Sequence, residues 1–274
     1  MMSLYTHETG TPGAPTIVFL HGVGASGWMW GKQIAALADF HCINVDLPGH
    51  GKSNHMTWVS LADTADHIAA LIQSHATNGR AHVVGLSLGG YIALVLLERH
   101  ANVVDRAVIS GVTDTPMPNR ALLNPQLWLM SFLLKRRWFA NMQARSLPLS
   151  PNMQSAFTEN LLAMSLQAYR SIWEEVVDFY VPPSLSLVNN PTLIAAGGSE
   201  AKIIMQTVET IPKLMPNAQG ILAPGRGHGW NVEAPDLFNA MVRAWISGTP
   251  LPAGLQVAYS GGQPEQLMGN VSYR

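Results

Sequence analysis

The sequence has little that could cross-link the chain, attract nucleic acid or cross a membrane. Its 274 residues include a single cysteine, so no intrachain disulfide can form. Only 12% of the residues are charged, against a usual fraction of about 25%, and the formal net charge is −1. The one short basic block is Lys135-Arg136-Arg137, so nucleic-acid binding has no electrostatic support.

Long hydrophobic runs are also missing, since none approaches the roughly 20 residues that a membrane-spanning helix needs. The N-terminal segment lacks the basic start and apolar core of a signal peptide. We therefore expect a cytoplasmic protein without a membrane span. Cys42 lies in a strand-like run and is expected to be a small buried side chain rather than a catalytic thiolate. The low charge content leaves room for an apolar substrate entrance or a homodimer face.

Short apolar runs alternate with helical patterns along most of the chain. This alternation predicts an α/β fold with a mostly parallel sheet and helices on both faces. The length fits one such domain with an insertion. The expected strands are 16–20, 41–45, 81–86, 106–110 and 191–196, and the expected helices are 28–38, 61–74, 88–99 and 235–246.

Residues 115–190 interrupt the alternation, because they show helical patterns and no convincing strand. They are predicted to form an inserted helical subdomain, called the cap below. Residues 1–114 and 191–247 then make up the core. Residues 248–274 are rich in Gly, Pro and Ser and are predicted to be an irregular tail.

The segment "GLSLGG", residues 85–90, has the G-x-S-x-G pattern of a nucleophile elbow. It follows an expected strand and opens an expected helix, as a tight turn that exposes a serine hydroxyl requires. Side chains at Gly85 or Gly89 would collide with the neighbouring elements. Ser87 is therefore the candidate nucleophile, and the amide of Leu88 would point to the place where negative charge develops.

A general base is expected in "PGRGHGWN", residues 224–231, where His228 lies in a glycine-rich loop between a strand-like run and a helix. The other nine histidines show no metal-ligand spacing, so we expect no metal. Two carboxylates come between Ser87 and His228 in the chain and follow strands. Glu200 is favoured as the acid that orients the imidazole, and Asp114 stays an alternative.

The segment "FLHGVGASGW", residues 19–28, has two interpretations. Gly22-x-Gly24-x-x-Gly27 after a strand, with Asp46 about twenty residues later, matches a dinucleotide-binding fingerprint. The same letters could form an oxyanion loop of the type His-Gly-x-Gly. The nicotinamide interpretation leaves "GLSLGG" and "GHGW" unexplained, so the oxyanion loop is favoured and no cofactor is expected.

Together with "DLPGHGKS" at residues 46–53 and "GGSE" at 197–200, these motifs make the chain resemble the α/β-hydrolase family. The resemblance implies that Ser87 is the nucleophile, His228 the base, and the amides of Val23 and Leu88 the oxyanion hole. The family commonly has Asp where this chain has Glu200. The resemblance also implies a cap over the active site. Candidate substrate contacts are His21, Gly22, Trp128, Phe132, Trp138 and Trp230, and the cap aromatics Phe139, Phe157 and Trp173 could also line an acyl pocket.

The expected activity is hydrolysis of small to medium hydrophobic carboxylic esters through an acyl-enzyme, with the triad in the roles above. The same triad could instead serve C–C bond hydrolysis, lactone or thioester opening, or a cofactor-free lyase or perhydrolase reaction. A different class of function, a ligand receptor on a hydrolase scaffold with little turnover, also fits the motifs.

Overall fold

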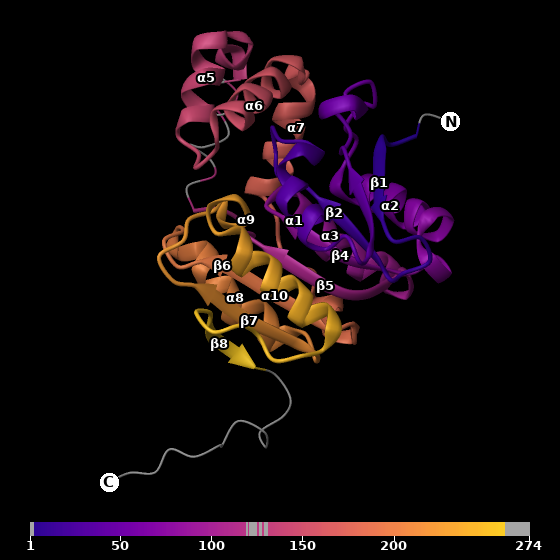
Figure 1. The fold of residues 1–274 in the computed structure, drawn as a ribbon. Helices are drawn as coiled ribbons and strands as arrows, with labels where there is room; N and C mark the ends of the chain where they lie inside the picture. Colours follow the sequence, from indigo (N-terminus) through magenta and orange to yellow (C-terminus); the bar gives the residue numbers. More distant parts are fainter. Residues whose placement is uncertain (1–2, 119, 121–124, 126–127, 129–130, 261–274) are drawn as a thin grey trace.

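The computed structural model describes residues 3–118, 120, 125, 128 and 131–260. Its core is an eight-stranded sheet in the order β1-β3-β2-β4-β5-β6-β7-β8 (Figure 1). Strands β2 to β7 run parallel, and the two edge strands, β1 and β8, are antiparallel to their neighbours. The strands are β1 Thr6–Gly10, β2 Thr16–Leu20, β3 His41–Val45, β4 Ala81–Leu86, β5 Val104–Ser110, β6 Thr192–Gly197, β7 Ala218–Ala223 and β8 Gln256–Ser260.

The central strands are buried on both faces because helices cover each side, as the alternation in the sequence predicts. Along β2, Val18 and Leu20 enter one core cluster, and Ile17 and Phe19 enter the other. Helices α2, α3 and α8 pack in the first cluster, and α1 and α10 in the second. The helices are α1 Gly31–Ala36, α2 Leu61–His75, α3 Leu88–His100, α5 Arg137–Arg145, α6 Pro151–Ala163, α7 Leu166–Val177, α8 Lys202–Leu214, α9 Trp230–Glu233 and α10 Pro235–Ser247.

The expected tail is in part a strand. Residues 256–260 form β8, which pairs with β7 and closes that edge of the sheet, so the prediction of an irregular segment is wrong for them. Residues 261–274 lie outside the described part. The single helix expected over 28–38 is a 3-10 helix, η1 Gly27–Trp30, followed by α1.

Helices α5, α6 and α7 form the cap, above the sheet in the view of Figure 1. Helices α5 and α6 and the 3-10 helix η5, Phe132–Lys135, share a small apolar cluster that includes Phe139, Phe157 and Leu161. Helix α7 packs into the core cluster instead, through Ile172 and Val176. The cap therefore has one part that packs on itself and one part that packs on the sheet domain.

A half-buried carboxylate attaches α7 to the core. Glu175 accepts hydrogen bonds from Trp58 Nε1 at 2.9 Å and from the amide of Leu61, the first residue of α2, at 2.8 Å. Burial raises the pKa of this carboxyl above its ordinary value. None of the helices in the described ranges is long and apolar enough to cross a membrane.

Candidate active site

Ser87 stands at the turn between β4 and α3 in a strained backbone conformation, with φ 54° and ψ −117°. Its amide donates to the carbonyl of Ser110 on the neighbouring strand at 2.8 Å. The flanking glycines leave no room for side chains. A Cβ at Gly85 would lie 2.3 Å from the carbonyl oxygen of Gly89, and a Cβ at Gly89 would lie 2.0 Å from that of Leu20. The turn is thus possible only with the G-x-S-x-G spacing.

The structure brings Glu200 to His228. Glu200 Oε2 lies 2.5 Å from His228 Nδ1, and Oε1 accepts the amide of Gly197 at 2.7 Å. The Glu200 side chain is 1% exposed and that of His228 is 42% exposed. A carboxylate can only accept, so Nδ1 carries the proton and Nε2 is left free to act as a base.

Asp114, the alternative acid, has no hydrogen bond to His228 among the described residues. Its carbonyl oxygen accepts the amide of Val181, and its carboxylate accepts a long hydrogen bond of 3.4 Å from Thr115 Oγ1. The bond from His228 to Glu200 therefore distinguishes two carboxylates that chain order alone could not separate.

Ser110, at the end of β5, connects the two loops that carry Ser87 and His228. Its carbonyl accepts the Ser87 amide, and its hydroxyl accepts Trp230 Nε1 at 3.0 Å. The next residue, Gly111, has φ +71° and lies against the imidazole, since a Cβ there would lie 2.7 Å from His228 Cε1. The end of β5 thus sets the position of the histidine ring relative to the serine turn.

The loop after β2 lies beside the serine turn. The carbonyl of His21 accepts the amide of Gly89 at 3.0 Å, and a Cβ on Gly22 would lie 3.5 Å from Ser87 Cβ. Val23, the next residue, lines the same cavity as Ser87. Leu88 is the first residue of α3, and the first amides of a helix have no partner within it.

His21 is fully buried and supports this loop from inside. Its Nε2 accepts the amide of Leu47 at 3.0 Å, so its Nδ1 carries the proton and donates to the carbonyl of Gly22 at 2.8 Å. The ring of His50 packs edge-on against the ring of His21, with 5.0 Å between the ring centroids. Burial lowers the pKa of His21 to about 4 and that of His50 to about 3, so both rings are neutral near pH 7.

Asp46 organises the adjacent turn. Its two carboxylate oxygens accept the amides of Gly27 at 2.7 Å and Lys52 at 2.8 Å. Gly27 is also needed sterically, since a Cβ there would lie 2.6 Å from the Asn44 side chain. These contacts give Asp46 and Gly27 structural roles in the turn. Cys42 is buried, and burial raises the pKa of its thiol to about 11, which leaves it protonated.

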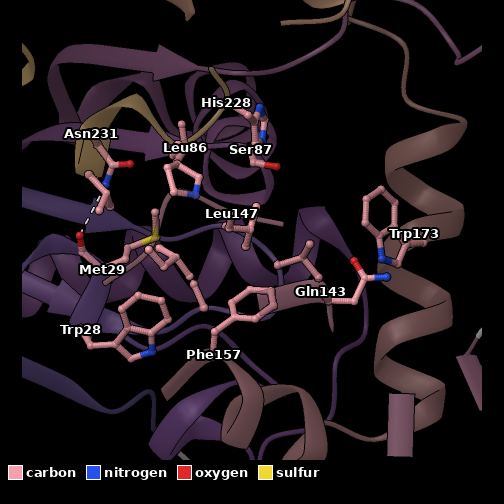
Figure 2. A pocket seen from close by; sticks show the side chains of 17 residues that line it. Trp28, Met29, Leu86, Ser87, Gln143, Leu147, Phe157, Trp173, His228 and Asn231 are labelled. Atoms are coloured by element: carbon pink, nitrogen blue, oxygen red, sulfur yellow. Dashed lines mark hydrogen bonds between the residues drawn. The ribbon is translucent and has the colours of Figure 1, made fainter. Parts of the chain in front are cut away.

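A largely apolar cavity of about 250 Å³ lies between these loops and the cap. Figure 2 shows Ser87 and His228 on one part of its wall, Trp28 and Met29 on another, and Gln143 and Trp173 across from them. The lining residues are Gly22, Val23, Ala25, Trp28, Met29, Leu86, Ser87, Gln143, Leu147, Pro148, Leu149, Phe157, Trp173, His228, Gly229, Asn231 and Val232.

Of the six candidate substrate contacts, the structure places only Gly22 in this wall. Trp128, Phe132 and Trp138 are 51%, 46% and 61% exposed on the cap, because the cap helices turn other side chains inward. Trp230 is fully buried and bonded to Ser110.

His21, the remaining candidate, is buried beneath the loop rather than facing the cavity. Sequence reasoning did not single out Trp28, Met29 and Gln143 as cavity residues. Trp28 and Met29 could have been found from their place directly after the glycine-rich loop.

Comparison with known proteins identifies the class of this fold and site. The chain matches the alpha/beta hydrolase family model over residues 17–241 and belongs to that family. An AB hydrolase superfamily protein of Gibberella zeae is 29% identical over 268 residues, which cover 92% of this chain and 86% of the relative.

One further relative is similar over part of the chain, and one solved structure is similar in fold. A pimeloyl-acyl-carrier-protein methyl ester esterase of Vibrio atlanticus is 33% identical over 161 residues, 58% of this chain and 52% of the relative. A thermophilic esterase of Thermogutta terrifontis has a similar structure, with a TM-score of 0.75 at 20% identity, covering 89% of this chain and 93% of that one. At that identity the structural likeness shows the shared fold alone.

Proposed function

We propose that the protein is a serine hydrolase that cleaves carboxylic esters of small to medium hydrophobic acids through an acyl-enzyme. The observation that carries the proposal is the arrangement of three side chains. Ser87 stands on a strained turn in the wall of the same cavity as His228, and the imidazole is held at Nδ1 by the buried carboxylate of Glu200.

In the first half of the reaction, His228 Nε2 takes the proton of Ser87 as the hydroxyl oxygen attacks the ester carbonyl. The tetrahedral oxyanion accepts the amides of Val23 and Leu88, each worth about 3 kcal/mol of the barrier by analogy with single-donor deletions. The protonated His228 then gives its proton to the leaving alcohol. In the second half, His228 takes a proton from water as the water oxygen attacks the acyl carbonyl, and it returns that proton to Ser87 Oγ as the bond to the acid breaks.

Glu200 stabilises the imidazolium in both halves without taking its proton. Its hydrogen bond from the amide of Gly197 and its burial fix the carboxylate in place. Glutamate is longer than the aspartate common in the family, and here the extra length is compatible with a direct bond to the ring.

The cavity supports the choice of substrate. Apolar side chains such as Trp28, Met29, Phe157 and Leu147 form most of its wall, and its volume suits acyl groups of modest length. Ester hydrolysis is also the activity named for the Vibrio atlanticus protein.

A panel of p-nitrophenyl esters of rising chain length tests the proposal, with wild type beside Ser87→Ala, Glu200→Gln and Asp114→Asn. We expect turnover of short to medium esters by wild type, none above background by Ser87→Ala, a kcat loss of at least tenfold in Glu200→Gln, and near-normal kcat in Asp114→Asn. Full activity of Ser87→Ala would remove the serine from the mechanism. An inactive Asp114→Asn beside an active Glu200→Gln would overturn the choice of acid.

The panel also distinguishes ester hydrolysis from the other readings of the same triad. Lactones, thioesters and a C–C bond substrate belong in it, because each presents a carbonyl to Ser87. Stoichiometric labelling by a serine-directed phosphonate without steady turnover of any substrate would instead favour a ligand receptor.

A further inference from the structure

The outer surface of the cap carries a concentration of exposed apolar side chains. Phe132, Leu133, Trp138 and Met142 are 46%, 37%, 61% and 50% exposed, and all lie in η5 and α5. Figure 1 shows α5 at the end of the molecule farthest from the sheet. Single exposed apolar residues are ordinary, whereas four within one short stretch of chain mark an interaction surface. We call these four residues, with Arg136 and Arg145, the cap face.

The chain segment that carries the cap face is basic, although Glu159 of α6 pairs with Arg137 beside it. Residues 115–158 contain no Asp or Glu, although the chain as a whole has a net charge of −1. The same stretch has five basic residues, Arg120, Lys135, Arg136, Arg137 and Arg145.

The partners of these basic side chains leave two arginines available. Arg137 pairs with Glu159, and Lys135 Nζ donates to the carbonyl oxygen of Leu162 at 2.6 Å. Arg136 and Arg145 are exposed and form no ion pair within the described residues.

The cap face is a fixed feature of a packed helix. On α5, Phe139, Ala140 and Ala144 face the cap cluster and hold the helix in place. Trp138, Met142 and Arg145 follow at intervals of four and three residues, which places them on one side of a helix. The outward side of α5 therefore combines a tryptophan, a methionine and a cation on a rigid support.

We propose that the cap face docks on the surface of an anionic phospholipid bilayer. Tryptophan and aliphatic side chains enter the boundary between headgroups and acyl chains, and basic side chains are attracted to anionic headgroups. The match rests on charge complementarity as well as on exposed apolar area.

Two other occupants fit the cap face less well. A second copy of the chain, in a two-fold contact through this surface, would bring Arg136 and Arg145 close to the same residues of the partner, which repel. A nucleic acid would match the charge, and its bases could stack on Trp138, but aliphatic Leu133 and Met142 offer no stacking platform. The proposal goes beyond ester hydrolysis and does not depend on it, although a docked cap would place the cavity next to lipophilic substrates.

Co-sedimentation of the full chain with large unilamellar vesicles tests this proposal. One set of vesicles is pure phosphatidylcholine, and the other contains about 30% phosphatidylglycerol. We expect the protein to sediment with the anionic vesicles and only weakly with the neutral ones, and we expect rising salt to weaken binding.

Two double variants separate the contributions of the basic and the apolar side chains to vesicle binding. Arg136→Gln with Arg145→Gln should lower the partition coefficient on anionic vesicles about 25-fold, at about fivefold per basic residue. Trp138→Ser with Met142→Ser should lower binding at least tenfold on the same vesicles. The matched controls are Lys32→Gln, an exposed cation on α1, and Leu187→Ser, which is 79% exposed outside the cap face; both should bind like wild type.

Several results would overturn the proposal. These are no sedimentation with anionic vesicles, equal binding to both vesicle types, or equal losses in the cap-face and control variants. If sedimentation velocity shows a dimer of the wild-type protein and Trp138→Ser abolishes it, the cap face is a self-association surface. Binding of a single-stranded oligonucleotide that exceeds vesicle binding and needs Arg136 and Arg145 would assign it to nucleic acid. Because none of these measurements uses an ester substrate, they are independent of the proposed catalysis.

Discussion

A methyl group added at Gly111 should disable catalysis while leaving the fold intact. The Cβ of Gly111→Ala would lie 2.7 Å from His228 Cε1 and 2.9 Å from Nδ1. Carbon atoms in ordinary contact are about 3.5–4.0 Å apart, so the imidazole must retreat by roughly 1 Å. A displacement of that size at a catalytic group can cost about 100-fold in rate. We therefore expect kcat for a p-nitrophenyl ester to fall about 100-fold.

The same substitution also strains the backbone, because Gly111 has φ +71°. A residue with a Cβ in that conformation costs roughly 1–2 kcal/mol, which could lower activity through partial unfolding alone. Gly225 offers a matched control, since its φ is +69° and nothing lies within 4 Å of the Cβ position. Gly225→Ala should show the same loss of stability with kcat near that of wild type.

Steady-state kinetics and urea unfolding of both variants decide the matter. We expect similar unfolding midpoints and a kcat ratio of about 100 between Gly225→Ala and Gly111→Ala. If the two variants have kcat values within threefold of each other, the end of β5 does not set the position of the histidine.

Two further predictions concern buried groups of the site. Trp230→Phe removes the donor to Ser110 Oγ and should lower kcat about tenfold with little change in KM. The control is Trp30→Phe, which should change neither value, because Trp30 is equally buried and its Nε1 has no partner among the described residues. Equal effects of the two variants would contradict a role of Trp230 in positioning the site. The buried His21 and His50 have pKa values of about 4 and about 3, below the ordinary 6.5. As the pH falls below about 6.5, the unfolded chain takes up protons at these two rings before the folded protein does, so the free energy of unfolding decreases. Between pH 7.5 and 5 each ring should cost roughly 2 kcal/mol of unfolding free energy, and His50→Gln should remove about half of this loss in urea titrations; an unchanged loss would show that the buried rings do not cause it.

The parts of the fold that could be predicted from the sequence are those fixed by local constraints. Fully buried strands such as β2 and β4 stand out as apolar runs. Gly85 is required by a contact within the turn itself, with Gly89, whereas Gly89 is required by the neighbouring strand β2. The strands β1 and β8 could not be found in this way. Both lie at the sheet edges with mostly exposed side chains, so they show no apolar run.

The cavity wall required information that the sequence does not carry locally. Whether an aromatic residue of the cap faces inward depends on how each cap helix is rotated against the core. Phe157 and Trp138 are both aromatic residues of cap helices, yet Phe157 lines the cavity and Trp138 faces outward. For the same reason, the sequence could not decide whether Glu200 or Asp114 contacts His228. Both residues follow neighbouring strands, and they differ only in the direction of the side chain.

The acyl-enzyme mechanism rests on a single nucleophile, and labelling with a fluorophosphonate tests it most directly. Intact mass and peptide mapping should find one adduct per chain on Ser87, no adduct in Ser87→Ala, and slow labelling in His228→Ala. Two results would contradict the proposed mechanism: wild-type protein that hydrolyses esters but is not labelled by the fluorophosphonate, or an adduct on a residue other than Ser87.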